Sequence, residues 1–531
     1  MDDEKDLCKP LLERIMQLNE ENDLLATANV DLHKQVADLK KELERYTMKD
    51  LGVDGEVSSR EELPPAPARK KGPERLDLLP LPKLIVDDTA SSGTYAKTQV
   101  AKITDVCGNT NPICVAFCTG ETHLRLAEQY QEKAMGASTL VLVGGVDKIV
   151  RVYAYSHETN EHNELFRVEV MAPVLGVTSC GDMAACAQMD GTVAVMHIPT
   201  ASTHATCSTS SVPIAPASTW GQPGMTSHKR HSKYLACVAF SAKGDVMCAV
   251  CPAERAISLY RDGGSTRTWT FLASLTLDAS PEGAIFVPEP VRTDGVEGEV
   301  LVIALRESAN LVALRGTTAF PEAHGDSSPL QFTEYRIPLN EHEWDSHASF
   351  SALALAASTD CVTVEAAKGG ICGPLVVSTD KGTHLLVAWE GSSPGGKLHS
   401  SNASLVAAVA AGVGGVDGQL RVVPSERVAM LHDHNCSEYG KPCVAWGSTE
   451  GKARFLYSNS EGESCIYVYD TLQARTRAVA GAQTNTSGSI GACGSVAKLQ
   501  GHKGIVRGLA SHTSLGLLAS VSYDHTLVMW R

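Results

Sequence analysis

The chain has 531 residues, a formal net charge of −15 and 16 cysteines, and it contains no apolar run long enough to cross a bilayer. A negative charge of this size argues against direct binding of nucleic acid, which needs clustered Lys and Arg. The acidic N-terminus lacks the basic-then-apolar pattern of a secretory signal. We therefore expect a cytoplasmic protein with reduced cysteines, with a nuclear location as the alternative.

Residues 7–49 carry a heptad repeat that predicts an α-helical coiled coil. Leucine recurs at every seventh position, and a position four residues later holds apolar side chains or asparagine. This narrow seam favours a parallel dimer, in which buried asparagines fix the register, over a single amphipathic helix packed on another domain. Little charge flanks the seam, which leaves a homodimer or a mixed dimer open, and we expect the homodimer. The dimer seam consists of Leu11, Ile15, Leu18, Asn22, Leu25, Asn29, Leu32, Val36, Leu39 and Leu43.

Residues 50–94 predict a flexible linker. They are rich in Pro, Glu, Arg and Ser, as in the stretch ELPPAPARKKGPER, and this composition favours an extended polyproline II conformation. The basic run within residues 69–75 has two interpretations: a nuclear signal or, more simply, a solvated part of a charged linker.

Short alternating strands predict an all-β domain over residues 95–531. The clearest hairpins are Thr139–Tyr155, with an inner strand at Pro112–Cys118, and Met183–Ile198, which has a tight Asp190-Gly191 turn. A third hairpin lies within Leu235–Asp262. Fainter hairpins follow at residues 298–315, 373–390 and 453–470.

The most informative stretch is the last one, Leu499–Arg531. It contains Gly501-His502, two short strands, a tight turn with Asp524 and a final strand ending at Trp530. This order resembles one repeat of the WD-repeat family, whose four antiparallel strands form one blade of a β-propeller. Because one blade cannot bury its own faces, the resemblance implies further blades upstream. With the six hairpins above, this repeat predicts a seven-bladed propeller.

The resemblance also implies how the last blade is held together. His502 can bond to Asp524 in the turn, while the hydroxyl of Ser520 and the indole N–H of Trp530 complete a chain of satisfied buried polar groups. We interpret these four residues as structural rather than catalytic.

Two further features bear on the architecture. The element VGGVD occurs at residues 143–147 and again at 413–417, and we interpret the second copy as an insertion or an elaborated outer strand, with an eighth blade as the alternative. The last blade also ends without an outer strand of its own. A strand at residues 97–106 has the alternation needed to supply it and to close the ring.

The family further implies a place for partners to dock. The residue before the turn acid points to the rim of the central channel. In this chain the rim positions are apolar or aromatic, which is typical of a protein interface, although burial beneath insertions would explain the same residues. The candidate partner-binding rim consists of Val146, Met189, Ala253 and Tyr523.

Candidate metal ligands and catalytic motifs are weak. Residues 432–436 (HDHNC) fall where a blade-entry histidine belongs, and Cys248-x-x-Cys251 lies at the end of a strand. Neither has a second ligand pair at zinc spacing, and no phosphate loop or nucleophile elbow occurs. We therefore expect no metal, no cofactor and no catalytic residues.

The sequence thus predicts a non-enzymatic scaffold that dimerises through its coiled coil and binds protein partners on its propeller. A coiled coil followed by a propeller also resembles autophagy scaffolds, corepressors and ubiquitin-ligase adaptors. The alternatives are a nuclear, chromatin-associated or ubiquitin-ligase adaptor, and an enzyme or small-molecule sensor that uses the central channel.

Overall fold

The computed structural model describes only part of the chain. The described residues are 97–118, 138–198, 225–263, 268–288, 299–306, 308, 310–316, 332–339, 351–357, 371–390, 407–408, 421–422, 425–431, 442–449, 452–471, 473–474 and 492–531. The chain divides into two units, residues 1–76 and 77–531, and all described residues belong to the second. The predicted coiled coil with its dimer seam, and the predicted linker, lie outside the described residues.

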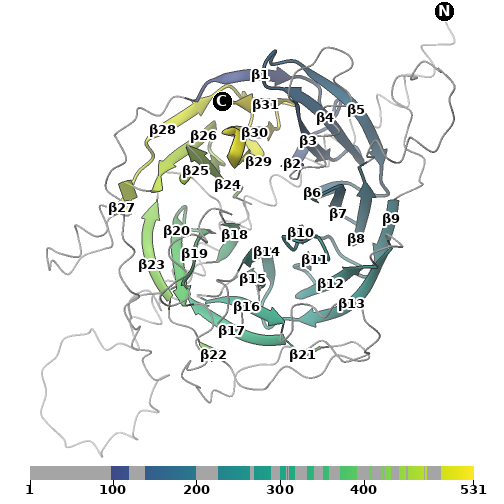
Figure 1. Cartoon of the computed structure of the whole chain (residues 1–531), viewed down its shortest axis with the longest axis vertical. Coiled ribbons are helices and arrows are strands. Elements are labelled where there is room, and N and C mark those ends of the chain that lie inside the picture. The colour runs from purple at the N-terminus through teal and green to yellow at the C-terminus, as the bar shows by residue number, and fades with distance from the viewer. Residues whose placement is uncertain are drawn as a thin grey trace, which may run out of the picture. The chain divides into compact units, whose positions relative to one another are not determined.

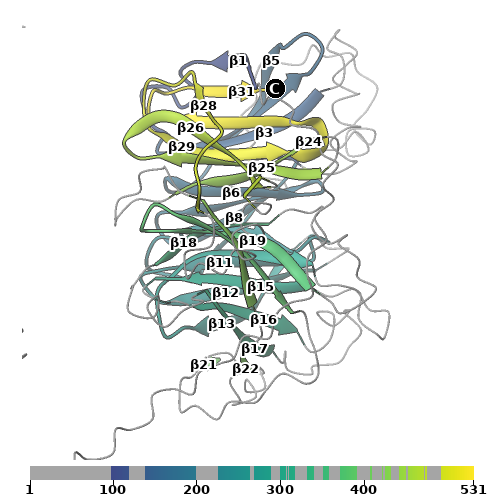
Figure 2. The ribbon, with the colours of Figure 1, turned by 90° about the vertical axis from the view of Figure 1, so that its left-hand side faces the viewer.

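The described strands form seven antiparallel blades arranged in a ring (Figure 1). This confirms the prediction of an all-β, seven-bladed propeller. Each blade has four main strands, here termed a to d from the central channel outwards, and Figure 2 shows the blades following one another when the ring is seen from the side. Among the described residues, none belongs to a helix long and apolar enough to span a membrane.

The first three blades follow the chain in order. Blade 1 consists of β2 (Pro112–Phe117), β3 (Ser138–Gly145), β4 (Ile149–Ser156) and β5 (His162–Glu169). Blade 2 consists of β6 (Val174–Cys180), β7 (Met183–Gln188), β8 (Thr192–His197) and β9 (Met225–Lys229). Blade 3 consists of β10 (Cys237–Phe240), β11 (Val246–Cys251), β12 (Ala256–Asp262) and β13 (Trp269–Thr276).

The next three blades continue this order. Blade 4 consists of β14 (Pro281–Pro288), β15 (Glu299–Leu305), β16 (Asn310–Gly316) and β17 (Phe332–Pro338). Blade 5 consists of β18 (Ala352–Ala357), β19 (Ile371–Thr379), β20 (His384–Glu390) and β23 (Ser425–Leu431). Blade 6 consists of β24 (Val444–Thr449), β25 (Lys452–Ser460), β26 (Glu463–Asp470) and β28 (Ala497–Gln500).

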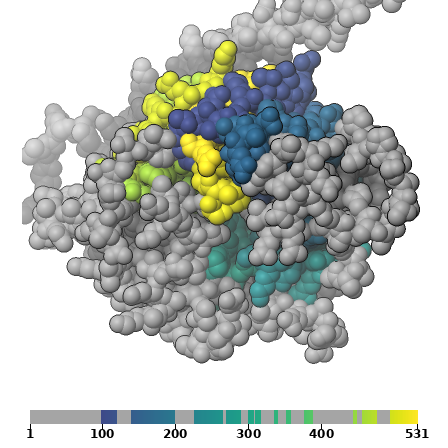
Figure 3. Space-filling model, turned by 45° about the horizontal axis from the view of Figure 1, so that its top comes forward, coloured from purple at the N-terminus to yellow at the C-terminus, as the bar shows by residue number. Residues whose placement is uncertain are grey.

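Blade 7 joins the two ends of the described sequence. Its inner strands are β29 (Val506–His512), β30 (Leu517–Ser522), after a 3-10 turn at Thr513–Leu515, and β31 (Leu527–Trp530). Its outer strand is β1 (Gln99–Ile103), which pairs antiparallel with β31 so that Gln99 lies opposite Trp530. Backbone bonds between Thr98 and Arg531 extend this pairing, and Figure 3 shows β1 lying between blade 7 and blade 1 at the surface.

Three two-residue strands extend the outer edges of blades 3 to 5. β21 (Ala407–Ala408) adds to β13, β22 (Arg421–Val422) adds to β17, and β27 (Ala492–Cys493) adds to β23. The first two flank the second VGGVD element, which itself lies outside the described residues. The flanking residues therefore serve as additional outer strands rather than as an eighth blade.

The hydrophobic core lies between neighbouring blades. One cluster joins Leu142 and Val152 of blade 1 to Cys186 and Ala194 of blade 2, and equivalent clusters bridge the other blades. Because side chains alternate along a strand, each blade presents one apolar face to each neighbour. Every blade therefore depends on the blades beside it for burial.

Strand direction assigns each connection to one of two faces. In every blade the b–c turn and the d–a connection to the next blade lie at the same end of the strands, here termed the upper face. The long connections at 119–137, 199–224 and 475–491 join strand ends at the lower face. On the upper face, all connections of blades 7, 1, 2 and 3 are short and fully described.

Candidate interaction face

The four residues predicted to hold blade 7 lie in contact. The hydroxyl of Ser520 is 2.7 Å from Nε2 of His502 and accepts a 2.8 Å hydrogen bond from the indole N–H of Trp530. Nδ1 of His502 lies 3.3 Å from both carboxylate oxygens of Asp524. Because all four groups are nearly excluded from water, each needs the others as hydrogen-bond partners.

Asp524 also organises the turn at the upper face. It accepts hydrogen bonds from the backbone N–H of Lys503 at 2.7 Å and from the hydroxyl of Thr526 at 2.6 Å. Burial alone would raise the pKa of this carboxyl, but the bonds from His502, Thr526 and Lys503 outweigh it and hold the pKa well below its ordinary value. The Asp524 carboxylate is thus held within the blade by its hydrogen bonds. These bonds also hold the turn that contains the neighbouring Tyr523.

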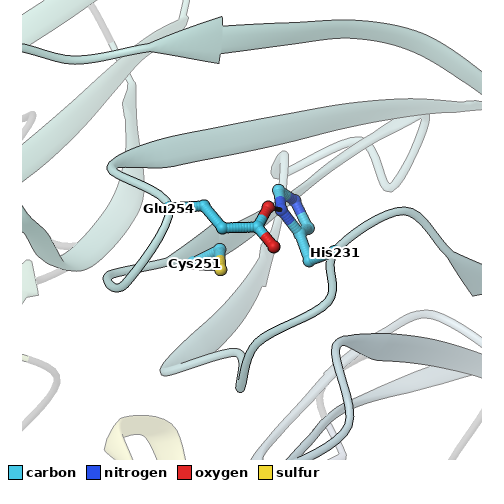
Figure 4. A group of neighbouring side chains, drawn as sticks. All are labelled: His231, Cys251 and Glu254. Atoms are coloured by element: carbon cyan, nitrogen blue, oxygen red, sulfur yellow. Dashed lines mark hydrogen bonds and ion pairs between the residues drawn. The ribbon is translucent and has the colours of Figure 1, made fainter.

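Blade 3 contains a second relay of the same kind. Nδ1 of His231 lies 2.6 Å from Glu254, and Figure 4 shows these two side chains facing each other. Nε2 of His231 lies 2.7 Å from the hydroxyl of Ser258. The backbone N–H and hydroxyl of Ser232 both donate to the other oxygen of Glu254. Burial opposes ionisation of this carboxyl, but these hydrogen bonds lower its pKa to about 2.

Glu254 takes the place of the turn acid in blade 3, but its partners His231 and Ser258 were not predicted from the sequence. A usable signal existed, because His231 precedes Glu254 by 23 residues and His502 precedes Asp524 by 22. The serine was harder to find, since it comes from strand c in blade 3 and from strand b in blade 7.

The thiol of Cys251 lies near this relay, so the group resembles a metal-ligand cluster. The ligand atoms of His231, Cys251 and Glu254 are all within 4.8 Å of one another (Figure 4). Both ring nitrogens and both carboxylate oxygens are already in hydrogen bonds, and burial raises the pKa of the Cys251 thiol. The bonding is therefore that of a blade relay, in which Cys251 serves as core.

The other candidate ligand sets do not form a site among the described residues. Cys248 and Cys251 pack into different core clusters, because residues three apart on a strand point to opposite faces. These two thiols cannot share a metal ion. The predicted cluster at residues 432–436 lies outside the described residues.

All four predicted rim positions are exposed on the upper face. Val146, Met189 and Tyr523 are 43%, 58% and 37% exposed, and Ala253 is exposed as well. The described residues therefore leave these side chains uncovered. Their role in partner binding stays a prediction.

Two exposed apolar side chains were missed by sequence reasoning. Met171 is 76% exposed in the connection from blade 1 to blade 2, and Tyr234 is 42% exposed in the connection from blade 2 to blade 3. Both connections lie on the upper face. Of the large apolar side chains that are exposed in the described part of the chain, only Val496 lies elsewhere, beside the lower end of β28. We term Tyr523, Val146, Met171, Met189 and Tyr234 the apolar arc.

Hydrogen bonds fix each turn of the apolar arc to the connection beside it. The backbone N–H of Val146 donates to Asn111 at 3.1 Å, and that of Met189 donates to Pro173 at 2.9 Å. Met171 lies on a connection anchored at both ends, because Val170 bonds to blade 1 and Ala172 bonds to blade 2. The apolar side chains therefore stand on a rigid base.

Hydrogen bonds also cross from blade to blade. The ring N–H of His525, two residues after Tyr523, donates to the carbonyl of Thr110 at 2.8 Å in the connection to blade 1. The backbone N–H of Leu235, next to Tyr234, donates to the carbonyl of Gln188 at 3.1 Å in blade 2. The connections that carry the arc are thus tied to one another from blade 7 to blade 3.

Comparison with protein-family models gives independent support for the propeller fold. The model for the WD domain, G-beta repeat, matches residues 493–531, which hold β28 to β31 and the relay of blade 7. Together with the ring of seven blades, this match supports the WD-repeat family for this chain. No curated protein sequence matches it, so the WD-repeat assignment carries no subfamily.

Proposed function

We propose that this WD-repeat protein is a non-enzymatic scaffold whose upper face binds protein partners. WD-repeat propellers generally serve as interaction scaffolds, but the fold alone does not name a ligand. The observation that supports the proposal is the apolar arc. Tyrosine on a rigid base is typical of interface hot spots and loses little conformational freedom on binding, while the flexible methionine side chain adapts to the shape of a partner.

The double variant Met189→Glu, Tyr523→Glu tests this proposal. It places two charges in the apolar arc without touching a relay residue, so we expect partner capture to fall at least tenfold. The measurement is quantitative affinity purification of full-length protein from cells. The matched control is Val496→Glu, an exposed apolar side chain at the lower face, which should retain its partners. Equal capture by wild type and double variant would remove the upper face as the docking site.

We also propose that the scaffold is a homodimer joined through residues 7–49. The heptad seam supports this, because leucine at one core position and asparagine at the other are typical of two-stranded parallel coils. Light scattering should give twice the 56.4 kDa chain mass, and Leu25→Glu with Leu32→Glu should give monomers. A monomeric wild type would contradict the proposal.

A further inference from the structure

The upper face around the apolar arc is basic, although the protein carries a net charge of −15. The connections of blades 7, 1, 2 and 3 on this face expose more cations than acids. The exposed acids are Asp105, Glu169 and Asp278, and the last of these pairs with Arg336 of blade 4. The exposed cations are Lys148, Arg230, Lys233, Arg255 and Lys503.

This excess arises because the turn carboxylates are engaged in hydrogen bonds and ion pairs within their own blades. Asp524 and Glu254 are bound in their relays, and Asp147 forms a 2.5 Å ion pair with the buried Arg151. Asp190 accepts hydrogen bonds from the backbone and hydroxyl of Thr192. The acids that the sequence places in each turn therefore contribute little to the surface that a partner meets.

Cations alternate with apolar anchors along the arc. Lys148 follows Val146 by two residues in one turn, and Lys233 precedes Tyr234 directly. Lys503 is bonded through its backbone to Asp524, the neighbour of Tyr523. None of these three lysine side chains takes part in an ion pair between described residues. They are available to a ligand that also reaches the apolar side chains.

We propose that the apolar arc binds an extended, acidic peptide segment with large apolar side chains among its Asp and Glu residues. This inference rests on the proposed function and names the chemistry of the partner. Carboxylates of the segment would meet Lys148, Lys233 and Lys503 while its apolar residues pack on the anchors. A nucleic acid fits less well, because the centre of the surface is apolar, whereas binding of a phosphate backbone needs clustered Lys and Arg.

The chemistry of the bound segment can be tested with a random 16-residue peptide library displayed on phage. The full-length protein serves as bait in the selection. We expect enriched peptides to be acidic and to contain large apolar residues. Their affinity, measured by fluorescence anisotropy, should fall at least tenfold in Lys148→Glu, Lys503→Glu and should weaken as salt is raised. Lys243→Glu, an exposed lysine in the a–b turn of blade 3 on the lower face, is the matched control and should bind as wild type does.

The outcomes separate the two proposals. Any one of three results would overturn the proposal of an acidic segment. The enriched peptides could be neutral or basic, no peptide could be enriched, or the affinities could be unchanged by Lys148→Glu, Lys503→Glu. If Met189→Glu, Tyr523→Glu still abolished partner capture, the upper face would stand as the docking site and only its charge preference would be wrong. If Met189→Glu, Tyr523→Glu left both partner capture and peptide affinity unchanged, both proposals would fall.

Discussion

Trp530→Ala is expected to lower the free energy of unfolding by about 3–5 kcal/mol. The side chain is only 2% exposed and packs in a core cluster with Tyr457, Ile466 and Leu499 of blade 6. Its removal would leave a cavity between blades 6 and 7. It would also leave Ser520 without its indole donor.

Trp530→Phe separates packing from hydrogen bonding. Phenylalanine keeps most of the buried area but cannot donate to Ser520, so we expect a cost of about 1–3 kcal/mol. Urea unfolding monitored by circular dichroism measures both variants. Trp530→Ala within about 1 kcal/mol of wild type would show that this seam does not limit the stability of the ring.

Gly191→Ala is expected to cost about 3 kcal/mol or more, an effect out of proportion to one methyl group. Gly191 has φ +87°, and a Cβ atom there would overlap the carbonyl oxygen of His231. That carbonyl cannot easily yield, because the His231 side chain is held by Glu254 and Ser258. The substitution would push blade 2 away from blade 3.

Gly181→Ala is the matched control within the same blade. Gly181 also has a positive φ, +57°, but nothing lies within 4 Å of the position that a Cβ atom would take there. We therefore expect only the backbone cost of about 1 kcal/mol. Thermal unfolding of the two variants side by side measures the difference, and equal shifts in Tm would show that the contact with His231 is not strained.

The hairpins were predictable because each repeats a local pattern. Short, largely apolar strands on either side of a turn occur in all seven blades, and Asp524 with Trp530 marks the last one. The relay of blade 3 was only half predictable. There the turn acid is Glu254 rather than aspartate, and the serine comes from a different strand, so no fixed spacing links the three residues.

Only part of the interaction face could be predicted from the sequence. Val146, Met189 and Tyr523 follow from their place before the turn, but Met171 and Tyr234 lie in connections whose side-chain directions have no period. The charge of the upper face could not be predicted from the sequence either. A sequence shows that a turn contains Asp147, but it does not show that Arg151 turns that carboxylate away from solvent.

The closure of the ring has a consequence for biosynthesis. β1 is the first described strand to be translated, and its partner β31 is the last, so blade 7 cannot be completed until nearly all of the described sequence has been made. During that interval β1 presents an unpaired edge to other nascent chains. Lys102, which in the finished ring donates to the carbonyl of Gly501, places a charge on that edge. We expect the charge of Lys102 to protect β1 from aggregation until β31 has been synthesised.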